Sequence, residues 1–318
     1  MNRVGVCYHP KNDAGRVLAE QLCERLRPQV PQVWMASAWE DVVRAQVAGT
    51  DLLFCVGGDG TVLRGARSVV PHGTLLLGVN LGHIGFLAEL DASEVMERLP
   101  DILACRGRVE ERAMLQAFVA APGGQTVWGG DGEAHVLNDL VVGRASLGRI
   151  IQFSVLADGI KVADYRADGV IVATATGSTA YSLALGGPIL YPESKEILVS
   201  PIAPHLSDRH SVVLPSTAVV EVQVLARAGV TVSVDGEAGP ELQPGQVVRA
   251  RLSSHVTRFL RLGPPSDFYA RVAQRLRWVR RPTAEEDRPE EDPPAGNDNA
   301  QREQQARGQG RLAGGAGP

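Results

Sequence analysis

A glycine-flanked aspartate, Asp59, is the residue best placed by its neighbours to do chemistry on a phosphorylated ligand. Five apolar residues, 52–56, have the pattern of a buried strand and run into Gly57-Gly-Asp-Gly-Thr61. Glycines let a nucleotide approach the main chain, and Thr61 is suited to cap the helix that the next residues predict. Three roles are open to Asp59: general base, organiser of a divalent ion, or helix cap. Arg64, one turn further on, can reach a ligand phosphate, pair with Asp59, or be plain surface charge.

A second polar constellation is the pair Asn138-Asp139, which ends a short apolar run and is followed by Arg144 and Arg149. The asparagine amide both donates and accepts hydrogen bonds, and a carboxylate can accept from two hydroxyl groups. The pair therefore suits a ribose or an amide-bearing ring. An Asx turn explains the same two residues from their spacing alone, so both interpretations stay open.

A third segment, residues 166–188, joins a buried-strand pattern to a turn rich in hydroxyl groups and glycine. Arg166 and Asp168 precede the strand, and the turn follows as Thr176-Gly-Ser-Thr-Ala-Tyr-Ser182. Gathering hydroxyl groups where a core wants apolar bulk costs free energy unless they are hydrogen-bonded. The composition therefore predicts that a ligand binds at this turn.

The elements that must position these residues change in type along the chain. Residues 1–105 alternate strand and helix patterns, which predicts a parallel sheet covered by helices in a Rossmann-like α/β domain. Ligands on such sheets bind at the carboxyl ends of the strands. Asp59 and a second glycine turn, Asn80-Leu-Gly-His-Ile-Gly-Phe-Leu87, both follow strands, so we expect the two turns to face one crevice.

Residues 106–260 have the short alternating runs and the glycine and proline punctuation of an all-β, sandwich-like domain. Residues 266–280 return to a helical pattern, and we expect this helix to pack back on the first domain. Residues 282–318 are rich in Pro, Glu, Asp, Gln and Gly, and contain a single large apolar residue, Leu312. This composition predicts a disordered tail, with an acidic partner-binding segment as the alternative.

Composition bounds the partners. The chain has 318 residues, 44% of them hydrophobic, and a formal net charge of -4, which gives no bulk attraction to nucleic acid or to an anionic membrane. Only three residues are lysines, and no Lys-containing Walker A loop is present. The four cysteines lie far apart without CxxC spacing, so we expect reduced thiols and no protein-held metal. We find no apolar run of membrane-spanning length, and we expect a cytoplasmic protein.

Several motifs in a fixed order make the chain resemble the ATP-NAD kinase family over residues 3–280. They are Gly57-Gly-Asp-Gly-Thr61, Asn80-Leu-Gly-His-Ile-Gly-Phe-Leu87, Glu110-Glu-Arg-Ala-Met114, Asn138-Asp139, Asp168-Gly-Val-Ile-Val-Ala-Thr-Ala-Thr-Gly-Ser-Thr-Ala-Tyr-Ser-Leu183 and Ser200-Pro-Ile-Ala-Pro-His205. The first motif is shared with diacylglycerol, sphingosine and phosphofructokinase relatives, whereas the next two are similar to those of the NAD kinases proper. The resemblance implies transfer of the ATP γ-phosphoryl group to the 2′-hydroxyl of the adenosine ribose of NAD, with a divalent cation (Mg²⁺ or Mn²⁺) accompanying ATP. It also implies a homo-oligomer, a dimer or a tetramer.

The resemblance also implies the residues of the site. Asp59 is the implied catalytic proton acceptor. The implied contacts with the dinucleotide come from Asp59, Gly60, Arg64, Asn138, Asp139, Arg149, Arg166, Asp168, Thr179, Ala180, Tyr181, Ser182, Leu183, Ala184, Ala203 and Glu237. Two positions depart from the family pattern: Asp139 is one methylene shorter than the more common Glu, and Glu237 brings a negative charge where many relatives carry Gln.

Two other functions share parts of these patterns. A lipid kinase uses the same glycine-aspartate turn but needs an apolar acceptor pocket or a membrane-facing surface, and the hydroxyl-rich turn and the charge balance argue against it. A non-catalytic dinucleotide sensor would retain the binding turns, and the presence of Asp59 argues against that. An assay for NADP formation separates all three functions.

Overall fold

The computed structural model describes residues 1–82, 85–129, 134–146, 150–205, 209–225 and 229–276. Its contacts divide the chain into a unit of Met1–Arg271 and a second unit, Val272–Pro318, of which residues 272–276 are described. The predicted tail at 282–318 and residues 277–280 of the predicted last helix lie outside the described residues. No helix among the described residues is long and apolar enough to cross a membrane.

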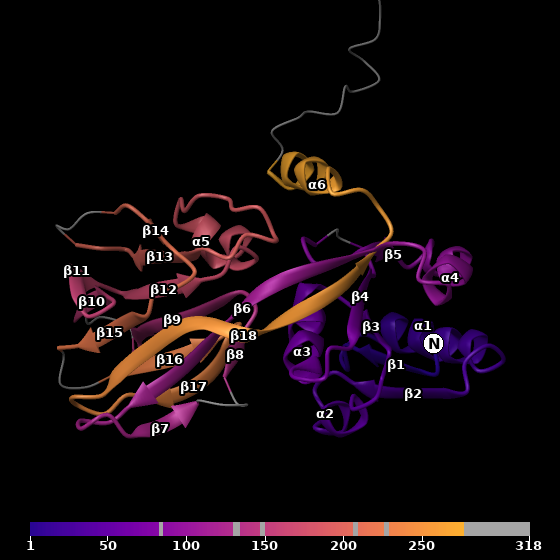
Figure 1. The fold of residues 1–318 in the computed structure, drawn as a ribbon, viewed down its shortest axis with the longest axis horizontal. Helices are drawn as coiled ribbons and strands as arrows, with labels where there is room; N and C mark the ends of the chain where they lie inside the picture. Colours follow the sequence, from indigo (N-terminus) through magenta and orange to yellow (C-terminus); the bar gives the residue numbers. More distant parts are fainter. Residues whose placement is uncertain (83–84, 130–133, 147–149, 206–208, 226–228, 277–318) are drawn as a thin grey trace, which may run out of the picture. The chain divides into compact units, whose positions relative to one another are not determined.

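The first hundred residues form the predicted parallel α/β arrangement (Figure 1). The elements are β1 (Arg3–Tyr8), α1 (Asp13–Leu26), β2 (Gln32–Ser37), α2 (Val42–Gln46), β3 (Leu52–Val56), α3 (Asp59–Val69), β4 (Leu75–Asn80), β5 (Leu90–Asp91) and α4 (Val95–Leu103). The predicted second helix is shorter than its apolar pattern, because Trp39 lies outside it and is 40% exposed.

Strand β3 is buried along its whole length because helices cover both faces of the sheet. Side chains alternate across a strand. Leu52 and Phe54 accordingly belong to one core cluster with residues of α1 and α4, while Leu53 and Cys55 belong to another with residues of α2 and α3. This packing fixes the carboxyl end of β3, where Asp59 begins α3.

The rest of the unit is a β-sandwich built on two sheets. Its elements are β6 (Arg108–Ala120), β7 (Thr126–Gly129), β8 (His135–Val136), β9 (Asp139–Arg144), β10 (Ile151–Ala157), β11 (Ile160–Ala167), β12 (Gly169–Ala173), a 3₁₀ turn (Gly177–Thr179), α5 (Tyr181–Ala184), β13 (Ile197–Ile202), β14 (Val212–Leu214), β15 (Val220–Val224), β16 (Val230–Val234), β17 (Glu237–Glu241) and β18 (Val247–Arg261). The helix α6 (Asp267–Arg275) follows. One sheet has the order β14-β13-β12-β9-β16-β17.

The other sheet is continuous with the parallel one. Its order is β11-β10-β15-β18-β4-β3-β1-β2, and β18 pairs in parallel with β4 and antiparallel with β6. Figure 1 shows β6 and β18 side by side. A large apolar cluster between the two sheets joins residues of β9, β12 and β16 to residues of β10, β15 and β18. The fold is therefore the predicted combination of an α/β part and a sandwich, joined by one long strand pair.

Candidate active site

Asp59 is held at the end of β3 by the second glycine turn. Its two carboxylate oxygens accept the backbone N–H groups of Phe86 (3.0 Å) and Leu87 (3.2 Å). Gly85 passes so close that a Cβ on it would lie 2.0 Å from the Asp59 carboxylate. Each carboxylate oxygen can accept a second hydrogen bond, and the side chain is half-buried. The two glycine turns therefore meet around a carboxylate whose oxygens can each accept a further hydrogen bond.

The prediction that Thr61 caps α3 is wrong. Gly58 occupies the N-cap position, and Thr61 lies inside the first turn. The Thr61 hydroxyl is buried and has no hydrogen-bond partner within the described part of the chain. The Thr61 side chain packs directly against Gly57, which has a φ of 152°. A Cβ on Gly57 would lie 2.4 Å from the Thr61 hydroxyl oxygen, so a larger residue does not fit there. The turn is therefore shaped by glycine rather than by a side-chain cap.

Arg64 and Glu237, two predicted site residues far apart in sequence, form an ion pair. The Glu237 carboxylate also pairs with Arg67, and the Arg64 guanidinium lies 4.3 Å over the ring of Trp39. Asp59, one of the partners that the sequence offered to Arg64, is not its ion-pair partner in the structure. The negative charge at Glu237 is thus balanced by two guanidiniums of α3, the helix that Asp59 begins.

The pair Asn138-Asp139 is positioned by a residue that the sequence reasoning missed. Asp235 is the first residue of a two-residue hairpin between β16 and β17, and both Asp235 and Gly236 have positive φ. Its carboxylate accepts the backbone N–H groups of Leu137 (3.1 Å), Asn138 (2.7 Å) and Asp139 (3.2 Å). These hydrogen bonds lie where the chain passes from β8 to β9. The Asp-Gly dipeptide after an alternating apolar run was the available signal.

Asp139 and Asp235 form a buried carboxylate pair. Burial and the neighbouring charge of Asp235 raise the pKa of Asp139 to about 7, although the Tyr181 N–H opposes the shift. Burial also raises the pKa of Asp235, against the effect of its three N–H donors. Two carboxyl groups that resist simultaneous ionisation give Asp139 a protonation change near neutral pH.

The prediction that the hydroxyl-rich turn needs a ligand rested on unsatisfied hydroxyl groups, and the structure shows that they are bonded within the protein. The Thr174 hydroxyl donates to the Leu137 carbonyl (2.5 Å), that of Ser178 to Ala175 (2.6 Å), and that of Thr179 to Thr176 (3.0 Å). These hydroxyl groups are satisfied within the protein, so they do not by themselves require a ligand. Their role in the fold is to bring the turn against Asn138, whose carbonyl oxygen would lie 2.0 Å from a Cβ on Gly177.

Three predicted contact residues lie at the other end of β12. Ala173 pairs with Asp139, whereas Gly169 pairs with Gly143, so Asp168 is one strand length away from the turn. Asp168 pairs with Arg144 (3.0 Å), and the Arg166 carbonyl accepts the N–H of His205. Ala203, exposed and at φ 45°, follows the neighbouring strand β13. One copy of the chain does not bring these residues to the Asn138-Asp139 end, and Arg149 lies outside the described residues.

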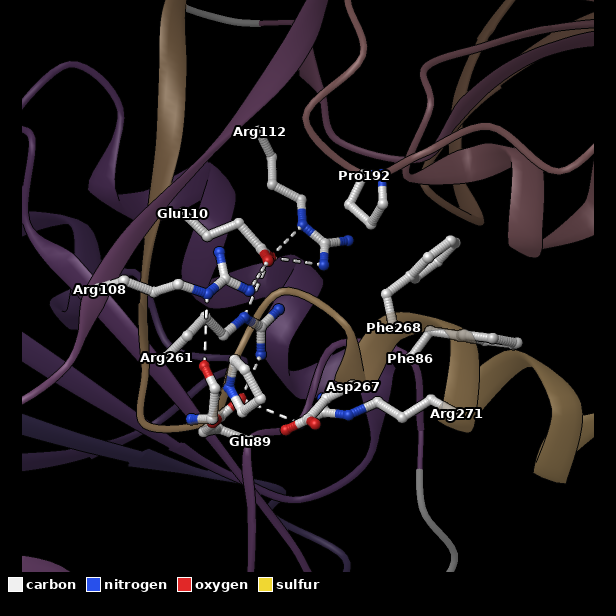
Figure 2. A pocket seen from close by; sticks show the side chains of 12 residues that line it. Phe86, Glu89, Arg108, Glu110, Arg112, Pro192, Arg261, Asp267, Phe268 and Arg271 are labelled. Carbon is white, nitrogen blue, oxygen red and sulfur yellow. Dashed lines mark hydrogen bonds and ion pairs between the residues drawn. The ribbon is translucent and has the colours of Figure 1, made fainter.

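A buried cluster of ion pairs, which was not predicted, lies next to the segment 85–87 that binds the Asp59 carboxylate (Figure 2). We call this segment the Asp59 loop. Glu110 pairs with Arg108, Arg112 and Arg261, and Arg261 also pairs with Glu89. The sequence contained a signal, because Glu110 and Arg112 alternate with exposed Glu111 and so point to the same face of β6. The described residues contain no group of three or more His, Cys, Asp and Glu side chains that can hold a metal ion.

A sheet that presents a single carboxylate at its carboxyl edge, joined to a sandwich with a buried polar pair, has the build of a nucleotide-dependent phosphotransferase. Comparison with known proteins gives the particular family. Residues 5–108 match the model of the ATP-NAD kinase N-terminal domain, and residues 137–262 match the model of the ATP-NAD kinase C-terminal domain. The chain belongs to the ATP-NAD kinase family.

Relatives agree with this membership, and solved structures share the fold. The chain is 38% identical over 277 residues to the NAD kinase of Dehalococcoides mccartyi (strain CBDB1), covering 86% of this chain and 96% of the relative. It is 40% identical over 280 residues to the NAD kinase of Chloroflexus aurantiacus (strain ATCC 29366 / DSM 635 / J-10-fl), covering 87% and 99%. Two crystal structures share the fold: yeast NADH kinase complexed with NADH (TM-score 0.77, 23% identity, 89% and 90% covered) and an NAD kinase from Archaeoglobus fulgidus in complex with ATP (TM-score 0.69, 22% identity, 87% and 99% covered).

Proposed function

We propose that this protein transfers the γ-phosphoryl group of ATP to the 2′-hydroxyl of the adenosine ribose of NAD, which gives NADP and ADP. The observation that carries the proposal is the Asp59 carboxylate, fixed at the end of β3 by two backbone N–H groups, with an acceptor position left on each oxygen. The 2′-hydroxyl is a poor nucleophile at neutral pH. A carboxylate about 2.6 to 3.2 Å from it takes its proton as the new oxygen–phosphorus bond forms, which contributes typically about 10² to 10⁴-fold.

The acceptor is held, in this proposal, by the polar pair next to the hydroxyl-rich turn. Asn138 donates to and accepts from the dinucleotide, and ionised Asp139 accepts ribose hydroxyl groups. Support comes from Asp235, because its buried carboxylate accepts three backbone N–H groups around this pair and so fixes the geometry of the pair. The segment 179–184 lies beside them and supplies backbone groups, of which the Tyr181 N–H already reaches Asp139.

The divalent ion enters with ATP in this proposal. The described residues hold no cluster of acidic ligands, so Mg²⁺ or Mn²⁺ bound to the phosphates fits this chain better than a resident ion. Such an ion neutralises charge on the phosphates. Asp59 and Arg64 then orient the reacting groups from the protein side, where positioning accounts for most of the rate.

In this proposal the protein is a homo-oligomer whose sites are shared between copies. This arrangement accounts for the predicted contact residues that lie at the far end of β12 from Asn138 and Asp139. Strands rise about 3.3 Å per residue, so the ends of a five-residue strand lie about 13 Å apart. Arg166, Asp168 and Ala203 therefore contact the dinucleotide, in this proposal, from a second copy of the chain. Mixed oligomers of Asp59→Asn and Asp168→Ala test this: a shared site regains activity in one of the two sites of a heterodimer, whereas sites within one copy stay inactive.

The central experiment incubates the purified protein with ATP, Mg²⁺ and NAD and measures NADP. We expect Asp59→Asn to keep NAD binding and to lose most turnover, and unchanged turnover would contradict the role of base. The structure adds one condition: an Asn side chain turns its NH₂ group toward one of the two N–H donors, so folding of the variant is checked by circular dichroism. Asn138→Ala should instead raise KM for NAD, through loss of a polar partner contributing about 1 to 3 kcal/mol.

A further inference from the structure

A buried network of charges connects the Asp59 loop to the turn that packs against Asn138. The Glu110 carboxylate accepts from Arg112 (2.7 and 2.8 Å), Arg261 (3.0 Å) and Arg108 (2.8 Å). From this centre, Arg261 reaches the Leu87 carbonyl (3.0 Å), and Arg112 reaches the Thr176 hydroxyl (3.4 Å). The network thus contacts both loops that shape the site.

The contact of Arg261 with the Leu87 carbonyl is shorter than the contact of Arg112 with the Thr176 hydroxyl. Leu87 donates its N–H to Asp59 and accepts the Arg261 guanidinium at its carbonyl, so a single residue lies between the candidate base and the network. Arg261 also pairs with Glu89 (3.1 Å), and Glu89 accepts the N–H groups of Leu262 (2.8 Å) and Gly263 (3.1 Å). The Asp59 loop is therefore anchored to the end of β18.

Glu110 and Arg112, at the centre of this network, are both charged at neutral pH. Burial opposes ionisation of Glu110, but the guanidiniums of Arg112 and Arg261 outweigh it and lower the pKa of Glu110 to about 2. Burial and the charge of Arg261 lower the pKa of Arg112 to about 10, which leaves it protonated. Two buried carboxylates, Glu89 and Glu110, thus face four guanidiniums, those of Arg108, Arg112, Arg261 and Arg271.

The cluster is a packed element rather than a ligand site. The cavity that it lines (Figure 2) has a volume of about 20 Å³, which is room for a single water molecule. The Glu110 oxygens are taken up by three guanidiniums. A buried carboxylate that is taken up by guanidiniums, and whose guanidiniums contact both functional loops, acts through position.

We propose that Glu110 is a positioning residue for the phosphoryl transfer: through Arg261 and Leu87 it fixes the carboxylate of Asp59 relative to the acceptor site. This role rests on the proposed function. This role adds to the proposed function a residue outside the site, Glu110, whose charge sets turnover without contact with either substrate.

The test compares Glu110→Gln with Glu111→Gln. Glu111 is the next residue of β6, faces the other way, and pairs with Arg258 at the surface (2.9 Å, side chains 52% and 46% exposed). We expect Glu110→Gln to lower kcat at least tenfold and to change KM for NAD less than threefold, while Glu111→Gln matches wild type. A kcat of Glu110→Gln within twofold of that of Glu111→Gln would overturn the proposal.

Arg261→Lys carries the test if Glu110→Gln does not fold. A lysine keeps the charge but lacks the planar fork that reaches Glu110 and Leu87 together. We expect the same fall in kcat. Combining either variant with Asp59→Asn distinguishes positioning from general damage: a residue that acts through Asp59 has little further effect once Asp59 is changed, whereas additive losses overturn the proposal.

Amide hydrogen exchange gives a readout that does not need activity. We expect the N–H groups of Phe86 and Leu87 to exchange at least tenfold faster in Glu110→Gln than in Glu111→Gln, because the anchor of their loop is lost. Equal exchange overturns the proposal. If wild-type protein makes no NADP, the proposed function fails, and this comparison alone then decides whether Glu110 holds the Asp59 loop.

Discussion

Replacing Asp139 with asparagine should make the protein more stable above neutral pH. Asp139 is 6% exposed, and burial together with the charge of Asp235 raises its pKa from the ordinary 3.8 to about 7. A folded state that holds a proton more tightly than the unfolded chain is favoured at low pH. The contribution of Asp139 is therefore fully present below pH 3.8 and is lost as pH rises through 7.

The size of the effect follows from the shift. Three pKa units at 1.36 kcal/mol each amount to about 4 kcal/mol, as an upper limit, between the two pKa values. Roughly two of these units lie between pH 5 and pH 7, which gives about 3 kcal/mol. An asparagine at this position has no proton to lose, and its carbonyl oxygen can still accept the Tyr181 N–H. We therefore expect the free energy of unfolding of Asp139→Asn, relative to wild type, to rise by about 3 kcal/mol from pH 5 to pH 8.

Urea denaturation followed by tryptophan fluorescence at several pH values measures this difference. Asp41→Asn is a matched control, because Asp41 is exposed and makes no side-chain hydrogen bond to the start of α2. Its stability should follow wild type at every pH. Parallel curves for wild type and Asp139→Asn between pH 5 and pH 8 would refute the reasoning, since they would mean that Asp139 ionises as easily in the folded protein as in the unfolded chain.

Three further substitutions test the geometry of the site. Gly85→Ala should lower kcat about tenfold or more with little change in KM for NAD, because its Cβ displaces the Asp59 carboxylate, 2.0 Å away; steady-state kinetics of NADP formation check this, and wild-type kcat would contradict it. Gly177→Ala places a Cβ 2.0 Å from the Asn138 carbonyl oxygen, so KM for NAD should rise and the melting temperature should fall; calorimetry and NAD titration measure both. Asp235→Asn leaves three N–H donors around a neutral side chain, so it should weaken NAD binding through Asn138, which isothermal titration detects, and unchanged affinity would exclude that positioning.

Local patterns were enough to predict much of the fold. The alternation of strand and helix, the buried run before Asp59 and the short runs after residue 106 correspond to β1–α4 and to the sandwich. These signals are read within windows of a few residues, which is the range over which strand and helix periods act. The residue that positions Asn138 was missed for the same reason: Asp235, which accepts its N–H, lies 97 residues further along the chain.

The chemistry-bearing residues divide in the same way. The sequence by itself determined that one aspartate follows a buried strand in a glycine turn, that an Asn-Asp pair follows a second run, and that the motifs are those of ATP-NAD kinases. Only the tertiary structure decided what contacts them: the N–H groups of Phe86 and Leu87 on Asp59, and on the Leu87 carbonyl the Arg261 guanidinium, which also donates to Glu110. Hydrogen bonds and ion pairs depend on distances of about 3 Å between groups remote in the chain, and spacing along a sequence carries no information on such distances.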